Sequence, residues 1–342
     1  MDPKTAQSLN DFFAAAAIIA GIAAIMAIPS FLLLRRAGLR ICPRWMSPGV
    51  PWLSAVLLLG LFPVALLGHQ IAVAASTLFV QQGHLPPSWR TSTDDPEATK
   101  QLQQIWAVIL TGPLFIAVYA VLRRYALAGS GFVQRPSVGR FARNVFLGIC
   151  GWAVLMPLTF TVHFAVLQLF QLLGIGEQQH PLMALRPQDD GTGGILFAIA
   201  VCGFTPVIEE CLFRGFLVPW AGQRRFAPWI LMAAALLLAG MTASTPVYPL
   251  AFIAVLCGLL IALPTITPRK RFPRRILAGI LSSSAVFAAV HSAVWPTPIP
   301  LFVLACGLGY LTARTRSIVP AVVVHGLFNA VSFAMLCRGS AI

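Results

Sequence analysis

Two adjacent glutamates followed by an arginine stand inside an apolar stretch of the sequence. Glu209 and Glu210 lie within the stretch 195–220, and Arg214 comes four residues after Glu210. A charge at bilayer depth costs about 2.5 kcal/mol or more, so three ionisable groups in one span indicate a functional site. Residues four apart share a helical face, so Glu210 and Arg214 are predicted to pair. Glu209 points about 100° away from Glu210 and is left without a local partner.

Two later apolar stretches carry a second set of polar side chains. His291 ends the sequence FAAVH, and His325 and Asn329 are the two ends of HGLFN. Because His325 and Asn329 are four residues apart, they face one side of a helix. Histidines within membrane spans are rare and tend to face the bundle interior. These residues predict one polar site built from three spans, although His291 taken alone fits an interhelical hydrogen bond equally well.

The composition is that of a helical membrane protein. Of the 342 residues, 58% are hydrophobic and 10% are charged, and the mean hydropathy is +0.82, whereas soluble domains carry about 25% charged residues. Apolar stretches of roughly 20 residues recur, which is the length of a transmembrane helix. The net charge of +14 does not indicate nucleic-acid binding, because the basic residues form short clusters between these stretches. The lipid bilayer is therefore the predicted environment.

The predicted fold class is an all-α, polytopic transmembrane bundle of about ten spans. The spans are placed at 12–34, 52–79, 104–122, 145–172, 195–219, 228–242, 250–266, 276–295, 300–313 and 318–337. Residues 1–194 would form an N-terminal transmembrane region of about four spans. Residues 195–337 carry all the polar motifs and would form the functional region. Gly203 is expected to let a neighbouring helix come close to the glutamates.

The charges also predict an orientation. With the N-terminus outside, most of the 24 lysines and arginines fall in cytoplasmic loops, as the positive-inside rule requires. Every acidic residue other than Glu209 and Glu210 lies in the outer tail or an outer loop. Both termini are therefore predicted to lie outside the cytoplasm. Glu209 lies about 14 residues into its span, roughly 21 Å at 1.5 Å per residue, which places the site toward the cytoplasmic side.

The three motifs together resemble the CPBP family, the CAAX prenyl proteases and bacteriocin-processing enzymes that are also called Abi proteins. The resemblance rests on E-E-x-x-F-R-G from Glu209, F-x-x-x-H ending at His291 and H-x-x-x-N from His325. It covers about 195–337. The first two motifs are further apart than expected for the family, and a hydrophobic hairpin near 228–266 is interpreted as an insertion between them.

The resemblance implies an all-helical intramembrane endopeptidase that uses a glutamate. Its catalytic residues would be Glu209, Glu210, Arg214, His291, His325 and Asn329. Glu209 would be the general base, and His291 would help to hold the attacking water. Arg214 would offset the charge of Glu210, and the two residues of the third motif would donate to the oxyanion. The substrate would be a membrane-associated protein or peptide, with a prenylated CAAX-type protein as one option.

Three alternatives remain open at this point. Two histidines and a glutamate can bind zinc, which would give a zinc-dependent membrane protease, although the sequence has no H-E-x-x-H helix. The same polar residues also suit a non-catalytic immunity or scaffold protein, or a proton-coupled transporter. A transporter usually shows repeat symmetry between its halves, and no internal repeat is found. We expect no cofactor, with zinc as the alternative, and no nucleic-acid partner.

Overall fold

The computed structural model describes residues 137–174, 198–243, 245–266 and 274–339, together with a few isolated earlier positions. The elements in these ranges are all helices. Their order is α4 (Val138–Leu172), η3 (Ile199–Phe204), α6 (Thr205–Leu212), η4 (Phe213–Leu217), α7 (Val218–Gln223), α8 (Ala227–Thr242), α9 (Val247–Ile266), α10 (Arg274–Val290), α11 (Pro298–Thr315) and α12 (Val319–Gly339). The predicted spans 12–34 and 52–79, and most of 104–122, lie outside the described residues.

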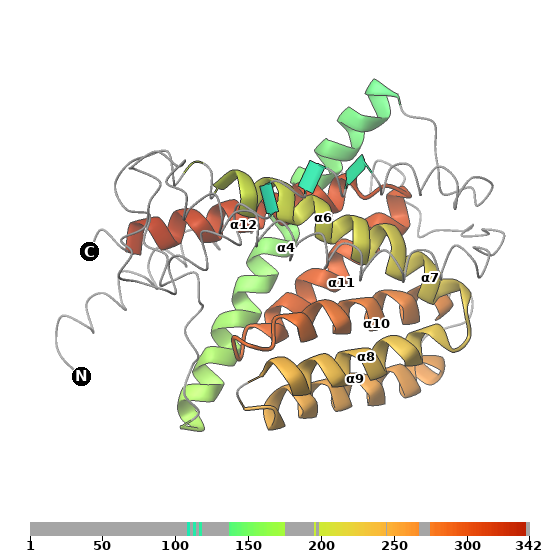
Figure 1. Cartoon of the computed structure of the whole chain (residues 1–342), viewed down its shortest axis with the longest axis vertical. Coiled ribbons are helices and arrows are strands. Elements are labelled where there is room, and N and C mark those ends of the chain that lie inside the picture. The colour runs from blue at the N-terminus through green and yellow to red at the C-terminus, as the bar shows by residue number, and fades with distance from the viewer. Residues whose placement is uncertain are drawn as a thin grey trace, which may run out of the picture.

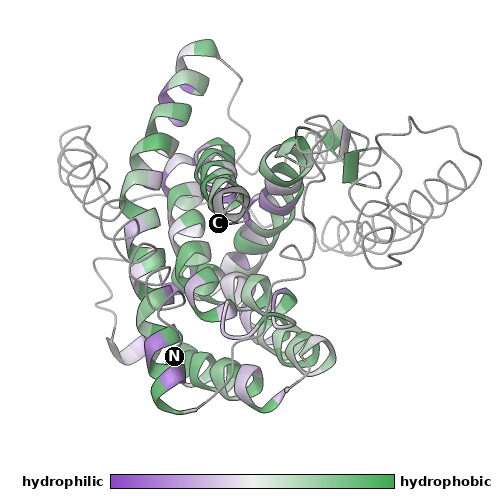
Figure 2. Cartoon of the chain, turned by 90° about the vertical axis from the view of Figure 1, so that its left-hand side faces the viewer, coloured by the Kyte–Doolittle hydropathy of each residue, from purple (hydrophilic) through white to green (hydrophobic). Residues whose placement is uncertain are grey.

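Three of the described helices are long and apolar enough to cross a membrane. They are Val138–Leu172, Val247–Thr265 and Pro298–Thr315, and shorter apolar helices lie at Ala227–Thr242 and Val319–Met335. Apolar residues cover most of the described ribbon, with hydrophilic residues in separate patches (Figure 2). The predicted all-α class is confirmed for this part of the chain, whereas the count of about ten spans stays a prediction.

The centre of the bundle is formed by α10 and α11 (Figure 1). α10 packs against α7, α8, α9 and α11, and α11 also packs against α4 and α12. The larger hydrophobic core joins Phe213 and Phe287 to apolar residues of α8 and α9. A smaller core joins Leu304 and Leu308 of α11 to Val324 of α12. In the described part of the chain, α10, α12 and η4, which carry residues of the three motifs, therefore all pack against α11.

α8 and α9 form the hairpin that the sequence predicts near 228–266. The two helices pack against each other and lie side by side along the lower edge of the bundle in Figure 1. Their outer faces expose large apolar side chains, among them Leu237, Val255 and Ile261, as expected for a helix pair in contact with lipid. That the hairpin is an insertion relative to the family stays a prediction.

Within the predicted span 195–219, the described residues 198–219 are helical, and this helical path contains two π-helical segments. η3 ends directly before α6, which starts with Pro206 in its first turn, and η4 follows directly after the glutamate-bearing α6. A π-turn leaves backbone carbonyls outside the usual bonding pattern. Two side chains from other helices bind such carbonyls. Asn329 Nδ2 donates to Val201 O at 2.8 Å, and Ser283 Oγ donates to Phe213 O at 3.2 Å.

Gly326 allows a close helix approach near the glutamates. Among the described residues, a Cβ atom added at Gly203 would meet nothing within 4 Å, so the close approach expected at Gly203 stays a prediction. A Cβ at Gly326 would stand 2.8 Å from the carbonyl oxygen of Cys202. Gly326 follows His325 directly, so the missing side chain lets α12 reach the backbone of η3 beside its histidine.

Candidate active site

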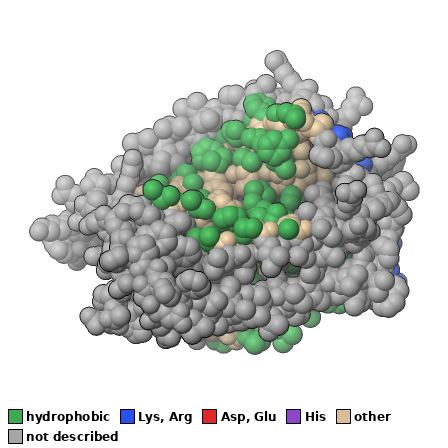
Figure 3. Space-filling view, turned by 45° about the horizontal axis from the view of Figure 1, so that its top comes forward, with side chains coloured by type: hydrophobic (Ala, Val, Ile, Leu, Met, Phe, Trp, Pro, Cys, Tyr) green, Lys and Arg blue, Asp and Glu red, His purple; other side chains and the backbone are tan. Residues whose placement is uncertain are grey.

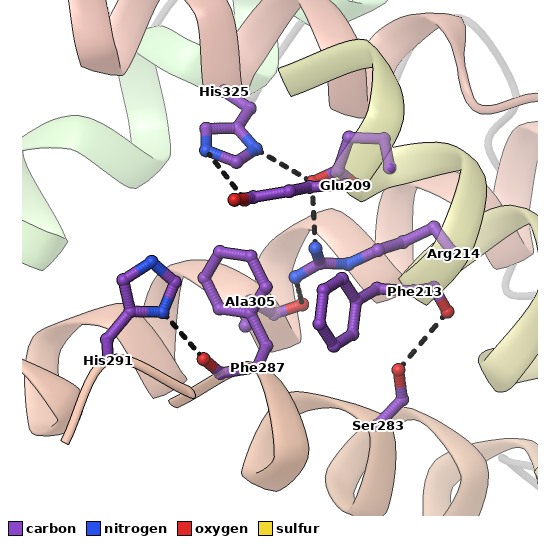
Figure 4. A network of polar contacts seen from close by, with 9 residues as sticks. Glu209, Phe213, Arg214, Ser283, Phe287, His291, Ala305 and His325 are labelled. Atoms are coloured by element: carbon purple, nitrogen blue, oxygen red, sulfur yellow. Dashed lines mark hydrogen bonds and ion pairs between the residues drawn. The ribbon is translucent and has the colours of Figure 1, made fainter. Parts of the chain in front are cut away.

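The Glu210–Arg214 ion pair forms as predicted and is enclosed by the protein. Arg214 Nη1 donates to Glu210 Oε1 at 2.7 Å, and the two side chains are 1% and 0% exposed. Arg214 Nη2 donates to the carbonyl oxygen of Ala305 on α11 at 3.1 Å. The guanidinium also lies 4.6 Å from the centre of the Phe287 ring. Burial makes a lone charge costly, so the pair holds α6, α10 and α11 together (Figure 4).

His325 of α12 contacts both glutamates. Its Nδ1 donates to Glu210 Oε1 at 2.9 Å, and its Nε2 lies 3.7 Å from Glu209 Oε2. Glu209 has no partner on its own helix, as predicted, and the imidazole beside it belongs to a residue 116 positions further along the chain. The side chain of Glu209 is 25% exposed, in contrast to that of Glu210. Glu209 is therefore the carboxylate that remains open to a further ligand.

His291 lies at the end of a helix rather than inside one. The prediction that the span continues to residue 295 is wrong, because α10 ends at Val290 and His291 begins a turn. The backbone N–H of His291 donates to Ala288 O at 3.0 Å, as in a turn. The imidazole Nδ1 of His291 donates to the Phe287 carbonyl at 2.8 Å. In an uninterrupted helix, this carbonyl would accept from the backbone N–H of residue 291. Since a carbonyl accepts, Nδ1 carries the hydrogen, and a neutral imidazole keeps its lone pair on Nε2.

Phe287 is the ring around which the site is arranged. Its side chain is 1% exposed. Its centroid lies 4.9 Å from that of His291 and 5.8 Å from that of His325. The ring also meets Phe213 edge-on at 5.0 Å. One apolar ring thus contacts both imidazoles and the Arg214 guanidinium, and the first two motifs meet at it.

The side chain of Asn329 contacts the backbone of the helical path that carries the glutamates. One hydrogen of Nδ2 is donated to Val201 O in η3. The expectation that His325 and Asn329 face one side is confirmed, since both contact the path 199–212. The oxyanion role assigned to Asn329 stays a prediction and would use the second hydrogen of the amide.

Two contributors to the site lie outside the three motifs. Ser283 of α10 holds the Phe213 carbonyl, and the Ala305 carbonyl of α11 accepts from Arg214. Ser283 has a signal in the sequence, because the triplet Ser282–Ser284 interrupts an apolar stretch and all three hydroxyls are buried. The Ala305 carbonyl has no signal in the sequence, because every residue type has a backbone carbonyl.

The donors available to a metal ion are limited in the part of the chain that the structure describes. There, no group of three or more His, Cys, Asp and Glu side chains is placed to hold an ion. His325 binds Glu210 through Nδ1, and His291 binds a carbonyl through Nδ1. Each imidazole therefore has only Nε2 for another ligand.

A family model matches the region that contains all six candidate residues. Residues 191–271 and 260–331 match the model described as type II CAAX prenyl endopeptidase Rce1-like. This region of the chain is therefore similar to the Rce1-like family. No curated protein and no solved structure gives a significant match. The resemblance stated from the motifs is thereby confirmed. An Rce1-like chain implies a peptidase that acts on a protein or peptide in a membrane, and the apolar helices agree with a multi-pass membrane protein.

Proposed function

We propose that this Rce1-like chain is an intramembrane endopeptidase in which Glu209 activates water. The observation that carries the proposal is the difference between the two adjacent glutamates. Glu210 is 0% exposed and shares one oxygen between Arg214 and His325. Glu209 is partly exposed, and in the described part of the chain its contact with a basic side chain is the 3.7 Å approach to His325. A base must reach water and a substrate, and Glu209 is the carboxylate that meets this condition.

The remaining side chains have separate roles in the proposed hydrolysis. A water held by Glu209 and by Nε2 of His291 would attack the scissile carbonyl and give its proton to Glu209. The carbonyl oxygen would become an oxyanion, and Nε2 of His325 would donate to it. When the tetrahedral intermediate collapses, the C–N bond breaks, and the proton on Glu209 passes to the leaving amine. The products are a carboxylic acid and an amine, with one water consumed.

The charges of the buried cluster favour a hydrogen-bond donor at His325. Glu209 and Glu210 bring two negative charges, and Arg214 brings one positive charge. A hydrogen on Nε2, in addition to the one that Nδ1 donates to Glu210, would make the group neutral as a whole. Such an imidazolium would offer Nε2–H to Glu209 at rest and to the oxyanion during reaction. Glu210 would then act by orienting His325 rather than by contacting the substrate.

The substrate we propose is a prenylated protein of the CAAX type, cleaved toward the cytoplasmic side of the membrane. The family description supports this class, and the molecule offers apolar surface for a lipid-bearing chain. Hydrophobic side chains gather on the described part of the face in Figure 3, while the Lys and Arg side chains visible there lie at one edge. A lipid group would keep the scissile bond at the depth of the glutamates.

Cleavage of defined peptides by the purified protein tests this function. A farnesylated peptide that ends in a CAAX sequence is compared with the same peptide without the lipid, in nanodiscs. We expect release of the C-terminal tripeptide from the lipidated peptide, at an undiminished rate after treatment with a chelator. Cleavage of the unprenylated peptide at the same rate would refute the substrate class. Loss of activity on chelation, with recovery on addition of zinc, would replace the glutamate mechanism by the zinc alternative.

A further inference from the structure

The position of His291 depends on a turn, because α10 ends one residue before it. The turn 291–297 has few bonds of its own. Val294 N donates to His291 O at 3.1 Å, and Thr297 N donates to Val294 O at 3.0 Å. Short turns of this kind are held in place by what their side chains contact. What fixes this turn therefore also fixes where the imidazole points.

The main anchor of the turn is Trp295, four residues after His291. Its side chain is 3% exposed and lies among three rings from other helices. It stacks on Tyr248 of α9 at 6.1 Å with an interplanar angle of 16°. It meets Phe252 of α9 and Phe170 of α4 edge-on, at 6.4 Å and 5.8 Å. Phe170 and Tyr248 also contact each other at 6.3 Å, so the four rings form one cluster.

A second contact joins the same hairpin to the last turn of α10. Thr242, at the end of α8, donates through Oγ1 to Leu238 O at 2.8 Å and to Ala289 O at 3.4 Å. Ala289 lies two residues before His291. Both helices of the hairpin thus contact the segment that bears the imidazole, one before it and one after it.

We propose that the hairpin α8–α9 positions His291 through its tip, with Tyr248 and Phe252 as positioning residues. Neither ring contacts the glutamates among the described contacts, so their effect passes through Trp295 and the turn. Stacked and edge-on pairs fix ring orientation as well as distance. A displacement of a catalytic group by about 1 Å can cost roughly 100-fold in rate. The inference rests on the proposed function, since it assumes that His291 holds the attacking water.

Removal of the Tyr248 ring is the direct test. Tyr248→Leu is expected to lower kcat by roughly 10- to 100-fold with KM changed by less than about threefold, because displacement of His291 affects the chemical step rather than uniform binding. Tyr248→Phe keeps the stacked ring and should retain the wild-type kcat. Trp229→Ala is the matched control, since Trp229 is an aromatic residue of the same hairpin that is 43% exposed. A raised KM with unchanged kcat would overturn the inference, as would equal losses in Tyr248→Leu and Trp229→Ala.

A double-mutant cycle separates positioning of His291 from a general loss of structure. In a His291→Ala background, residual cleavage is measured with enzyme in excess, and adding Tyr248→Leu should cost no further activity. An equal fold-loss in both backgrounds would show that Tyr248 acts by another route.

Hydrogen–deuterium exchange of the turn 291–297 gives a readout that needs no activity. Tyr248→Leu should speed exchange there, whereas Tyr248→Phe and Trp229→Ala should not. Unchanged exchange in Tyr248→Leu would refute the anchoring. If the wild type cleaves no peptide, the proposed function fails by itself, and the exchange result still decides whether the hairpin holds this turn.

Discussion

Replacing Arg214 by methionine would leave the carboxylate of Glu210 buried without its cation. Methionine occupies a similar volume, so little cavity is created, and the main loss is electrostatic. The 2.7 Å ion pair and the 3.1 Å bond to Ala305 O both disappear. Breaking a buried pair by removing one partner costs about 3–5 kcal/mol, because the other charge is left in the protein interior. We expect the free energy of unfolding of Arg214→Met to fall by this amount.

A second variant isolates the cause of that loss. Arg214→Met combined with Glu210→Gln removes both charges while the amide oxygen still accepts from His325. Only one or two hydrogen bonds are then missing, at about 1 kcal/mol each, so the double variant should recover about 2–3 kcal/mol relative to the single one. Arg225→Gln is the control, since Arg225 is exposed and should change stability by no more than about 0.5 kcal/mol.

The assay is reversible unfolding in mixed micelles with increasing SDS, followed by far-UV circular dichroism. The single variant, the double variant and the control are compared at the same lipid-to-detergent ratio. A double variant as unstable as Arg214→Met would refute the reasoning, since no stranded charge would then explain the loss. A single variant as stable as the wild type would show that Glu210 is not a buried anion.

Two further predictions use the same unfolding assay. Gly279→Val should destabilise the protein by about 1–3 kcal/mol through overpacking, because a Cβ there would lie 2.7 Å from the backbone nitrogen of Gly222. Gly258→Val is the control and should not destabilise in this way, since a Cβ at Gly258 meets nothing within 4 Å. Equal effects of the two variants would contradict the tight contact of α7 with α10. Ser283→Ala should cost about 0.5–1.5 kcal/mol, because it removes the side-chain donor to the Phe213 carbonyl, which keeps its bond from the backbone N–H of Val218. A loss below about 0.3 kcal/mol would show that the Ser283 bond does not stabilise η4.

The spacing of the polar residues predicted the parts of the site that lie within one helix. Residues four apart share a face whatever surrounds them, so the pairing of Glu210 with Arg214 followed from the sequence, as did the shared direction of His325 and Asn329. The hairpin followed as well, because two apolar stretches of this length joined by a short turn pack together.

The end of α10 and the π-helical segments could not be predicted in the same way. Beyond Val290 the sequence reads HSAVWPTPIP. Pro296 indicates that the helix ends near residue 295, but no residue marks an end before His291. The turn depends on Trp295 meeting rings more than 40 residues away in sequence, as the pairs Tyr248–Trp295 and Phe252–Trp295 show. Asn329 and Ser283 bind carbonyls of the π-helical segments from other helices. Such contacts are tertiary and have no local signature.

The most direct test of the central claim is the cleavage rate of Glu209→Gln under single-turnover conditions with the lipidated peptide. An amide has almost the shape of the carboxylate but cannot take a proton from water. We predict a rate at least about 100-fold below that of the wild type, with the SDS unfolding midpoint unchanged. A folded Glu209→Gln variant that cleaves within about threefold of the wild-type rate would contradict the assignment of Glu209 as the base.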